Sequence, residues 1–130
     1  MSDIIKLAVE AKEKSYSPYS NFKVGACIEG DNGKFYTGCN IESVSFTPTI
    51  CAERNAIGAA VMDGCKSFKK VAVACSGKGF AWPCGVCRQM LAEFGIDTIV
   101  IVVDKDGNTK SRMLKDLLPE AFVTYEEKEN

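Results

Sequence analysis

Four residues in two short segments have the types and the spacing of a metal centre with an acid beside it. TICAERNAI places Cys51 two positions before Glu53, and WPCGVCRQ places Cys84 and Cys87 three positions apart. Both segments come where we expect a helix to begin, so Cys84 and Cys87 share one face of their helix. Three thiolates with an open fourth position are typical of a catalytic zinc site rather than a structural one.

Each part of this pattern also has a simpler interpretation. Taken alone, Cys51 is a small apolar side chain and Glu53 a solvated acid of a first helical turn. A lone C-x-x-C pair is half of a structural zinc site, a thioredoxin-like redox pair or a coincidence. A site of four cysteines needs a second close pair, and a thioredoxin-like pair follows the first strand of its fold, whereas this one follows the third predicted strand. The remaining cysteines stand singly, and we expect them to be structural: Cys27, Cys39, Cys65 and Cys75.

The start of the second predicted helix offers backbone donors as well as a thiol. With Thr49 as the N-cap, the N–H groups of Cys51 and Ala52 have no acceptor within the helix. Likewise, Pro83 suits the first position of the next helix, where its missing N–H costs nothing. We therefore expect both helix starts to form a binding surface.

Positive groups near the cysteines would balance the charge of a zinc site. Three thiolates and a divalent zinc ion carry one net negative charge, which would keep a metal-bound water protonated. Two helix N-termini and the guanidinium groups of Arg54 and Arg88 offset that charge, so such a water can ionise near neutral pH. Glu53 is then placed to accept its proton.

Composition excludes several classes of function. The 130 residues contain no histidine, which removes histidine-based catalytic triads and histidine-ligated metals, and the seven cysteines are an odd number that does not suggest a disulfide framework. The formal net charge of −1 and the lack of a basic stripe argue against a nucleic-acid partner. No apolar run has membrane-spanning length and no export signal is recognisable, so we expect a cytoplasmic protein that does not contact membranes.

The predicted elements alternate as in an α/β fold. A hairpin comes early and β–α–β crossovers follow, which implies a layered single domain over residues 1–130 with a mixed sheet. Such a sheet binds ligands at the carboxyl ends of its strands, beside helix N-termini. Helices are predicted at residues 1–14, 49–62, 84–94 and 113–118, and strands at residues 22–29, 34–40, 69–75 and 98–103.

The two cysteine segments together resemble the signature of the zinc-dependent deaminases, with cysteine replacing the first histidine. C-A-E is followed, 33 residues after its cysteine, by P-C-x-x-C. The three-cysteine variant is similar to the small homotetrameric cytidine deaminases. SPYSNFKVGA, GCNIES, TICAER, PCGVCRQ and LLPEAF occur in that family's order and spacing, so the resemblance covers nearly the whole chain. It implies a three-layer α-β-α domain with a mixed, mostly parallel central sheet of about five strands.

The resemblance also implies a reaction. Cys51, Cys84 and Cys87 would bind one Zn²⁺, and a zinc-bound hydroxide would attack C4 of cytosine. Glu53 would carry protons from the zinc water to N3 and then to the departing ammonia. Cytidine and deoxycytidine would yield uridine and deoxyuridine, a step of pyrimidine salvage.

Further residues would bind the nucleoside according to the same resemblance. The Ala52 N–H would donate to the pyrimidine O2, Phe22 would stack on the base, and Asn40 and Glu42 would hold the ribose. Phe122 would cover the base from a neighbouring subunit of a tetramer with shared active sites. Each of these outer residues also has an ordinary interpretation, as a core aromatic, a packed C-terminus or a solvated loop.

Four residues depart from the family pattern. Ser43 stands where asparagine is usual and Phe46 where a tyrosine hydroxyl is usual, Val44 adds bulk, and Trp82 replaces a small residue before Pro-Cys. These changes affect the 5′ side of the substrate pocket, so a deaminase of a modified cytosine nucleoside such as blasticidin S is the alternative. A non-enzymatic zinc-binding module and a nucleic-acid editing enzyme are further alternatives, the latter disfavoured by the balanced charge.

Overall fold

The computed structural model describes residues 2–125. It contains each of the eight predicted helices and strands, and it adds one strand, β5, that the sequence did not predict. The elements are α1 (Asp3–Lys12), β1 (Val24–Gly30), β2 (Phe35–Cys39), α2 (Ala52–Met62), β3 (Phe68–Cys75), α3 (Gly85–Glu93), β4 (Ile99–Val103), β5 (Thr109–Met113) and α4 (Leu114–Leu117). Among the residues described, no helix is both long enough and apolar enough to cross a membrane.

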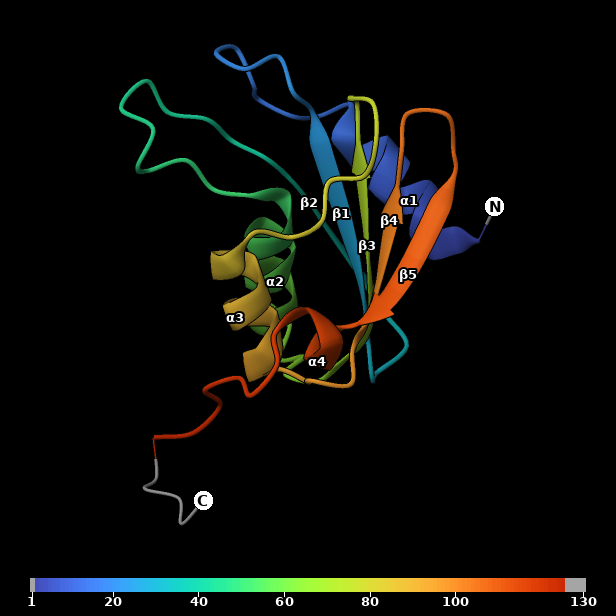
Figure 1. Ribbon diagram of the computed structural model, residues 1–130, viewed down its shortest axis with the longest axis vertical. Helices are drawn as coiled ribbons and strands as arrows, with labels where there is room; N and C mark the ends of the chain where they lie inside the picture. The colour runs from blue at the N-terminus through green and yellow to red at the C-terminus, as the bar shows by residue number, and fades with distance from the viewer. Residues whose placement is uncertain (1, 126–130) are drawn as a thin grey trace.

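The strands form one five-stranded mixed sheet in the order β2-β1-β3-β4-β5. Helix α1 covers one face, while α2 and α3 lie on the other (Figure 1), so the predicted three-layer α/β architecture is confirmed. The prediction of a mostly parallel sheet is wrong, because β3 and β4 form the one parallel pair among these five strands. The chain reverses after β4 at Asp104, whose carboxylate accepts the N–H groups of Asp106 and Asn108, and returns as β5.

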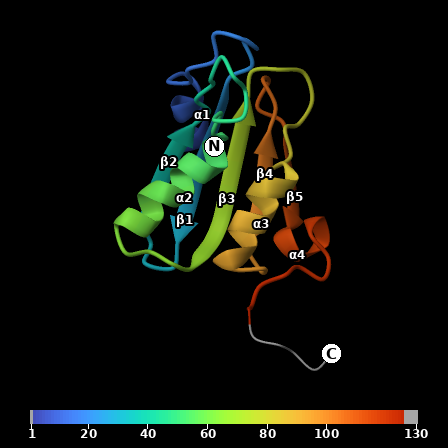
Figure 2. The same cartoon turned by 90° about the vertical axis from the view of Figure 1, so that its left-hand side faces the viewer.

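The parallel pair explains where the two cysteine-bearing helices begin. The chain passes from α2 into β3 and then through α3 into β4, which is parallel to β3. This crossover places α3 on the same face of the sheet as α2. Helices α2 and α3 therefore run side by side across that face (Figure 2), and their N-termini lie at the same end. Buried aliphatic side chains fill the space between the sheet and these helices, namely Ile28, Val73 and Val100 from β1, β3 and β4, and Leu91 from α3.

Helix α2 lies directly against β2 because residue 38 has no side chain. A Cβ atom at Gly38 would lie 2.5 Å from the carbonyl oxygen of Ala52 and 2.5 Å from the backbone nitrogen of Ala56. Both atoms belong to the helix backbone, which cannot move without moving the helix. Gly38 thus sets the distance between the sheet and the first turns of α2.

Gly38→Ala is therefore expected to destabilise the fold by roughly 1–3 kcal/mol, the usual range for overpacking. Gly58→Ala is the matched control, because Gly58 lies in α2, the helix that Gly38 contacts, and a Cβ at Gly58 would meet nothing within 4 Å. The free energy of unfolding of the control should rise by about 0.5–1 kcal/mol, because alanine has less backbone freedom than glycine in the unfolded chain. Urea unfolding of the two variants measures both effects, and equal stabilities would contradict the role given to Gly38.

Candidate metal centre and substrate cavity

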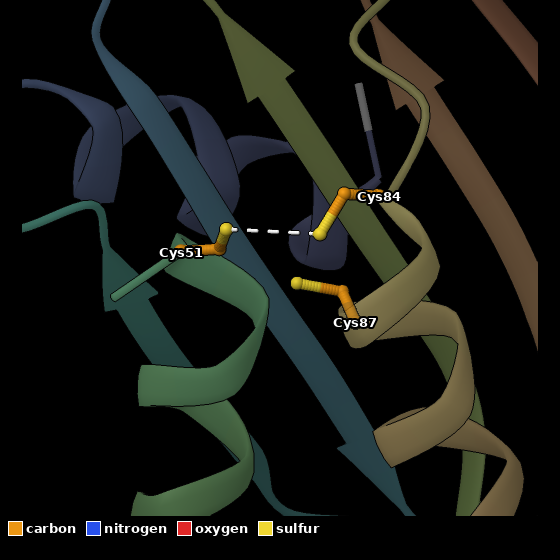
Figure 3. A group of neighbouring side chains, drawn as sticks. All are labelled: Cys51, Cys84 and Cys87. Carbon is orange, nitrogen blue, oxygen red and sulfur yellow. Dashed lines mark hydrogen bonds between the residues drawn. The ribbon is translucent and has the colours of Figure 1, made fainter. Parts of the chain in front are cut away.

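The structure brings the three predicted metal ligands together at the starts of α2 and α3. Cys51 and Cys84 are the N-cap residues of these helices, both with extended backbone (φ −69° and ψ 154°; φ −68° and ψ 171°), and neither makes a side-chain cap hydrogen bond. Cys87 follows in the first turn of α3, and its thiol points toward the other two (Figure 3). The predictions that Thr49 caps α2 and that Pro83 is the first residue of α3 are wrong, because the cysteines occupy the cap positions.

The spacing of the sulfur atoms fits one tetrahedral zinc ion. The Sγ atoms of Cys51 and Cys84 are 3.9 Å apart, and all three sulfurs lie within 4.8 Å of one another. Zinc–sulfur bonds of about 2.3 Å in tetrahedral geometry place ligand sulfurs about 3.8 Å apart. Among the residues that the structure describes, this group supplies three ligands, which leaves the fourth corner of the tetrahedron for a non-protein ligand.

The environment of the cluster favours thiolate. A hydrogen bond with Cys87 lowers the pKa of Cys51 to about 5, and Arg54 contributes in the same direction. The same contact and its burial raise the pKa of Cys87, which keeps the proton that the pair shares. The positive ends of α2 and α3 also face the sulfurs. The surroundings of Cys51 therefore favour a negative charge that a divalent cation can neutralise.

Of the two arginines expected to balance this charge, one contacts a cysteine. The Nη2 atom of Arg54 lies 3.5 Å from the Cys51 sulfur. Arg88 instead donates from Nε to the carbonyl oxygen of Pro83 at 2.7 Å and from Nη1 to that of Leu117 at 2.9 Å. The predicted contact between Arg88 and the thiolates is thus not among those of the described residues, and Arg88 joins α3 to the preceding loop and to α4.

Glu53 lies beside the cluster in an environment that favours its neutral form. It belongs to the first turn of α2 and is only 4% exposed. Burial raises its pKa to about 7, with a smaller contribution from the Cys51 thiolate, while its own backbone N–H acts in the opposite direction. A carboxyl group with a pKa near neutrality can both accept and release a proton at physiological pH.

A cavity of about 230 Å³ opens beside the sulfurs and contains most of the predicted substrate residues. Ala52 is the first residue of α2, so its N–H lacks an acceptor within the helix, as expected. Sequence analysis did not assign Val24, Thr49 or Ala81 to the site, and nothing in their residue types indicates such a role. The lining consists of Phe22, Val24, Asn40, Thr49, Cys51, Ala52, Glu53, Ala81, Trp82 and Cys84.

Asn40 fixes the segment that carries Phe22. Its Nδ2 donates to the carbonyl oxygen of Phe22 at 2.8 Å, and its Oδ1 accepts the Val24 N–H at 2.9 Å and the Ser15 hydroxyl. The edge of the Phe22 ring also lies where a side chain at Gly77 would be, since a Cβ there would approach Cε1 to 2.6 Å. Gly77 was not recognised in the sequence, because its role depends on a ring that lies far from it along the chain.

Glu42 lines a second cavity of about 360 Å³ next to the first, together with Tyr19, Ser20, Phe46 and Thr49. Its carboxylate accepts the N–H groups of Tyr19 and Ser20, both at 3.1 Å, and the Ser20 hydroxyl. The hydrogen bond from the Ser20 hydroxyl is the main reason why the pKa of Glu42 is lowered. Thr49 lines both cavities, so they adjoin.

Phe122 stands apart from these cavities in the single chain. Its carbonyl oxygen accepts a hydrogen bond from Gln89 Nε2 at 2.6 Å, which attaches the C-terminal segment to α3. Its side chain is 65% exposed. Phe122 is therefore largely exposed in the single chain and is not part of the cavity lining.

Comparison with known proteins gives one consistent result. Residues 1–103 match the family described as the cytidine and deoxycytidylate deaminase zinc-binding region. A cytidine deaminase of Sporosarcina psychrophila is 43% identical over 124 residues, which cover 92% of this chain and 91% of the relative. The crystal structure of cytidine deaminase from Burkholderia pseudomallei has a TM-score of 0.88 at 39% identity, and covers 94% of this chain and 100% of its own.

A second solved structure agrees with the first. The cytidine deaminase of Mycobacterium tuberculosis has a TM-score of 0.82 at 36% identity, with 93% of this chain and 95% of that chain covered. The sulfur cluster, the fold and these likenesses all point to one assignment. The chain belongs to the cytidine and deoxycytidylate deaminase family of zinc-dependent hydrolases.

Proposed function

We propose that this chain is a single-domain cytoplasmic enzyme that hydrolyses cytidine and deoxycytidine to uridine and deoxyuridine plus ammonia, a reaction of pyrimidine salvage. One observation carries the proposal: a buried carboxyl group, a free helix N–H and two of the three converging sulfurs line one cavity. These are an electrophile site, a proton carrier and a hydrogen-bond donor, which together suit hydrolysis of an amidine-like carbon. The named relatives support the choice of cytidine.

Each group has a defined part in this reaction. Cys51, Cys84 and Cys87 would hold the ion, and a zinc ion bound there would lower the pKa of water so that it ionises near neutral pH. Glu53 would accept a proton from water at its carboxylate and deliver it to N3 of the base. It would then carry a second proton, from the hydroxyl group added at C4, to the leaving amine. The Ala52 N–H donates to O2, which fixes the ring with C4 toward the sulfurs.

The two adjoining cavities suit the two halves of a nucleoside. The base would occupy the cavity beside the sulfurs, where Phe22 offers a ring for stacking. The sugar would extend past Thr49 into the second cavity, where the Glu42 carboxylate accepts hydroxyl hydrogens. Asn40 lines the cavity beside the sulfurs, and its amide has a second hydrogen for the ribose besides the one donated to the Phe22 carbonyl oxygen.

The proposed enzyme is a homotetramer with shared active sites. Several large apolar side chains are exposed in the single chain, including Val44 at 73%, Phe46 at 74% and Phe122 at 65%. A neighbouring subunit would cover them, and its Phe122 would close the base cavity. No nucleic acid or membrane takes part.

A deaminase of a modified cytosine nucleoside is the second candidate. Phe46 forms part of the sugar cavity but has no hydroxyl to pair with a sugar oxygen. Loss of such a partner costs about 1–3 kcal/mol when the oxygen is buried. Analogues that lack a normal 5′ end, such as blasticidin S, would therefore compete better here than in a site with tyrosine.

Steady-state turnover on cytidine, deoxycytidine and blasticidin S, together with the zinc content of the same preparation, tests the proposal. We expect about one zinc per chain and the largest kcat/KM for the two natural nucleosides. Turnover of blasticidin S alone would favour the second candidate. Absence of uridine formation by protein that contains zinc would refute the proposed function.

A further inference from the structure

Two cationic side chains of β5 lie over two aromatic rings of the loop that precedes Cys84. The Nζ atom of Lys110 is 5.1 Å from the centre of the Phe80 ring, and the guanidinium carbon of Arg112 is 5.8 Å from that of Trp82. Both distances are within the range of cation–π attraction. Because both cations and both rings are spaced two residues apart, β5 holds the loop at two successive points.

The two pairs differ in what the aromatic ring touches next. Phe80 and Trp82 are both partly buried and pack against the main core. Trp82 also lines the cavity beside the sulfurs, and Phe80 does not belong to that lining. Arg112 thus lies over a ring that forms a wall of the proposed base site, whereas Lys110 contacts a ring outside it.

The position of Trp82 relative to the sulfurs indicates which edge of the base it would meet. Ala52 and Glu53 lie in the first turn of α2, and Trp82 comes two residues before the cap of α3. The sulfurs lie between these two helix starts (Figure 3). Around cytosine the atoms follow the order O2, N3, C4 and C5. With O2 at Ala52, N3 at Glu53 and C4 at the sulfurs, C5 faces the side of α3.

On that side the cavity is lined by Ala81 and Trp82, of which only Trp82 is large. We propose that Trp82 determines which substituents the enzyme accepts at C5 of the pyrimidine, and that Arg112 is a positioning residue that holds the indole in place. This inference rests on the proposed deaminase function. The tryptophan leaves room for hydrogen at C5 and excludes a methyl group.

The kcat/KM ratio of 5-methylcytidine to cytidine tests this proposal. We expect wild-type protein to prefer cytidine and Trp82→Ala to raise the ratio at least about tenfold, as expected for one methyl group in an apolar pocket. Trp82→Phe, which keeps an aromatic side chain in the core, should raise the ratio by a smaller factor. It also provides a measurement if the alanine variant does not fold.

Variants of β5 separate positioning from general stability. Arg112→Gln should raise the ratio part of the way toward that of Trp82→Ala, and Arg112→Lys should restore most of the wild-type preference because it keeps the cation. Lys110→Gln is the matched control and should leave the ratio unchanged, since it removes the same type of contact from a ring outside the cavity.

The possible failures can be distinguished. Wild-type protein that contains zinc but does not turn over cytidine would refute the proposed function. Wild-type protein that prefers cytidine while both Trp82 variants keep its ratio within twofold would refute the role of Trp82 alone. If both Trp82 variants lost kcat/KM equally for cytidine and 5-methylcytidine, Trp82 would contact the face of the base and not C5. That result would also refute the proposed role of Trp82.

Discussion

The Glu53→Gln variant is expected to keep its zinc, while its kcat/KM for cytidine falls at least about a thousandfold. This loss is within the range that a positioned acid–base group contributes to the rate. The amide has nearly the shape of the carboxyl group but cannot accept a proton from water or deliver one to the base. Glu53 is 4% exposed and its pKa is raised to about 7 by burial, so at neutral pH the folded protein already accommodates an uncharged side chain there. The substitution should therefore leave the fold intact.

The measurement is kcat/KM for cytidine, with zinc content and melting temperature determined on the same samples. Glu10→Gln is the control, because Glu10 is an exposed acid of α1 on the opposite face of the sheet. It should match wild-type protein in all three quantities. If Glu53→Gln retained a tenth of the activity while zinc stayed bound, Glu53 would not be the proton carrier.

Cys87→Ser is expected to lose both the metal and much of the stability. Cys87 is fully buried between the starts of α2 and α3, and zinc bound to the folded state alone adds its binding free energy to that of folding. At metal concentrations 100 times the dissociation constant or more, the loss is at least about 3 kcal/mol. We expect less than about 0.1 zinc per chain and a clear drop in the urea midpoint.

Two comparisons separate loss of a ligand from damage to packing. Cys39→Ser changes a partly exposed thiol whose contact is with the carbonyl oxygen of Lys14, so zinc and stability should remain close to wild type. A strong chelator should lower the stability of wild-type protein to that of Cys87→Ser and leave the variant unchanged. A variant that keeps one zinc per chain would contradict the assignment of Cys87 as a ligand.

The sequence predicted the candidate metal centre well because its signal is local. Cys84 and Cys87 are neighbours on one turn, and Cys51 lies at another helix start that the crossover through β3 brings to the same place. The eight predicted elements also had strong apolar patterns or clear turn residues. Glycine and aspartate at turns, and valine and isoleucine in buried strands, act through backbone preferences that can be read without the fold.

What the sequence did not predict depends on contacts between distant segments. Strand β5 has the sequence TKSRM, which is polar and mostly exposed, so no apolar alternation marks it. The sheet is mainly antiparallel because β1 pairs antiparallel with both β2 and β3, and β5 adds a further antiparallel pair with β4. The helix starts were misplaced because cysteine is not a usual cap. Arg88 was assigned to the thiolates from its neighbours in sequence, whereas its partner Leu117 lies 29 residues away.

The placement of the two cap cysteines has a consequence for the chain as a polymer. Cys51 and Cys84 are 33 positions apart, and the segment between them contains β3, the central strand of the sheet. An ion that joined the two cysteines would close this segment into a loop. Closing a ring of that size with a disulfide removes roughly 4 kcal/mol of unfolded-state entropy in the chain-entropy account. Unlike a disulfide, this closure is reversible by mass action, so the melting temperature should rise with the logarithm of free zinc. The thermal stability of the protein would therefore depend on the concentration of free zinc around it.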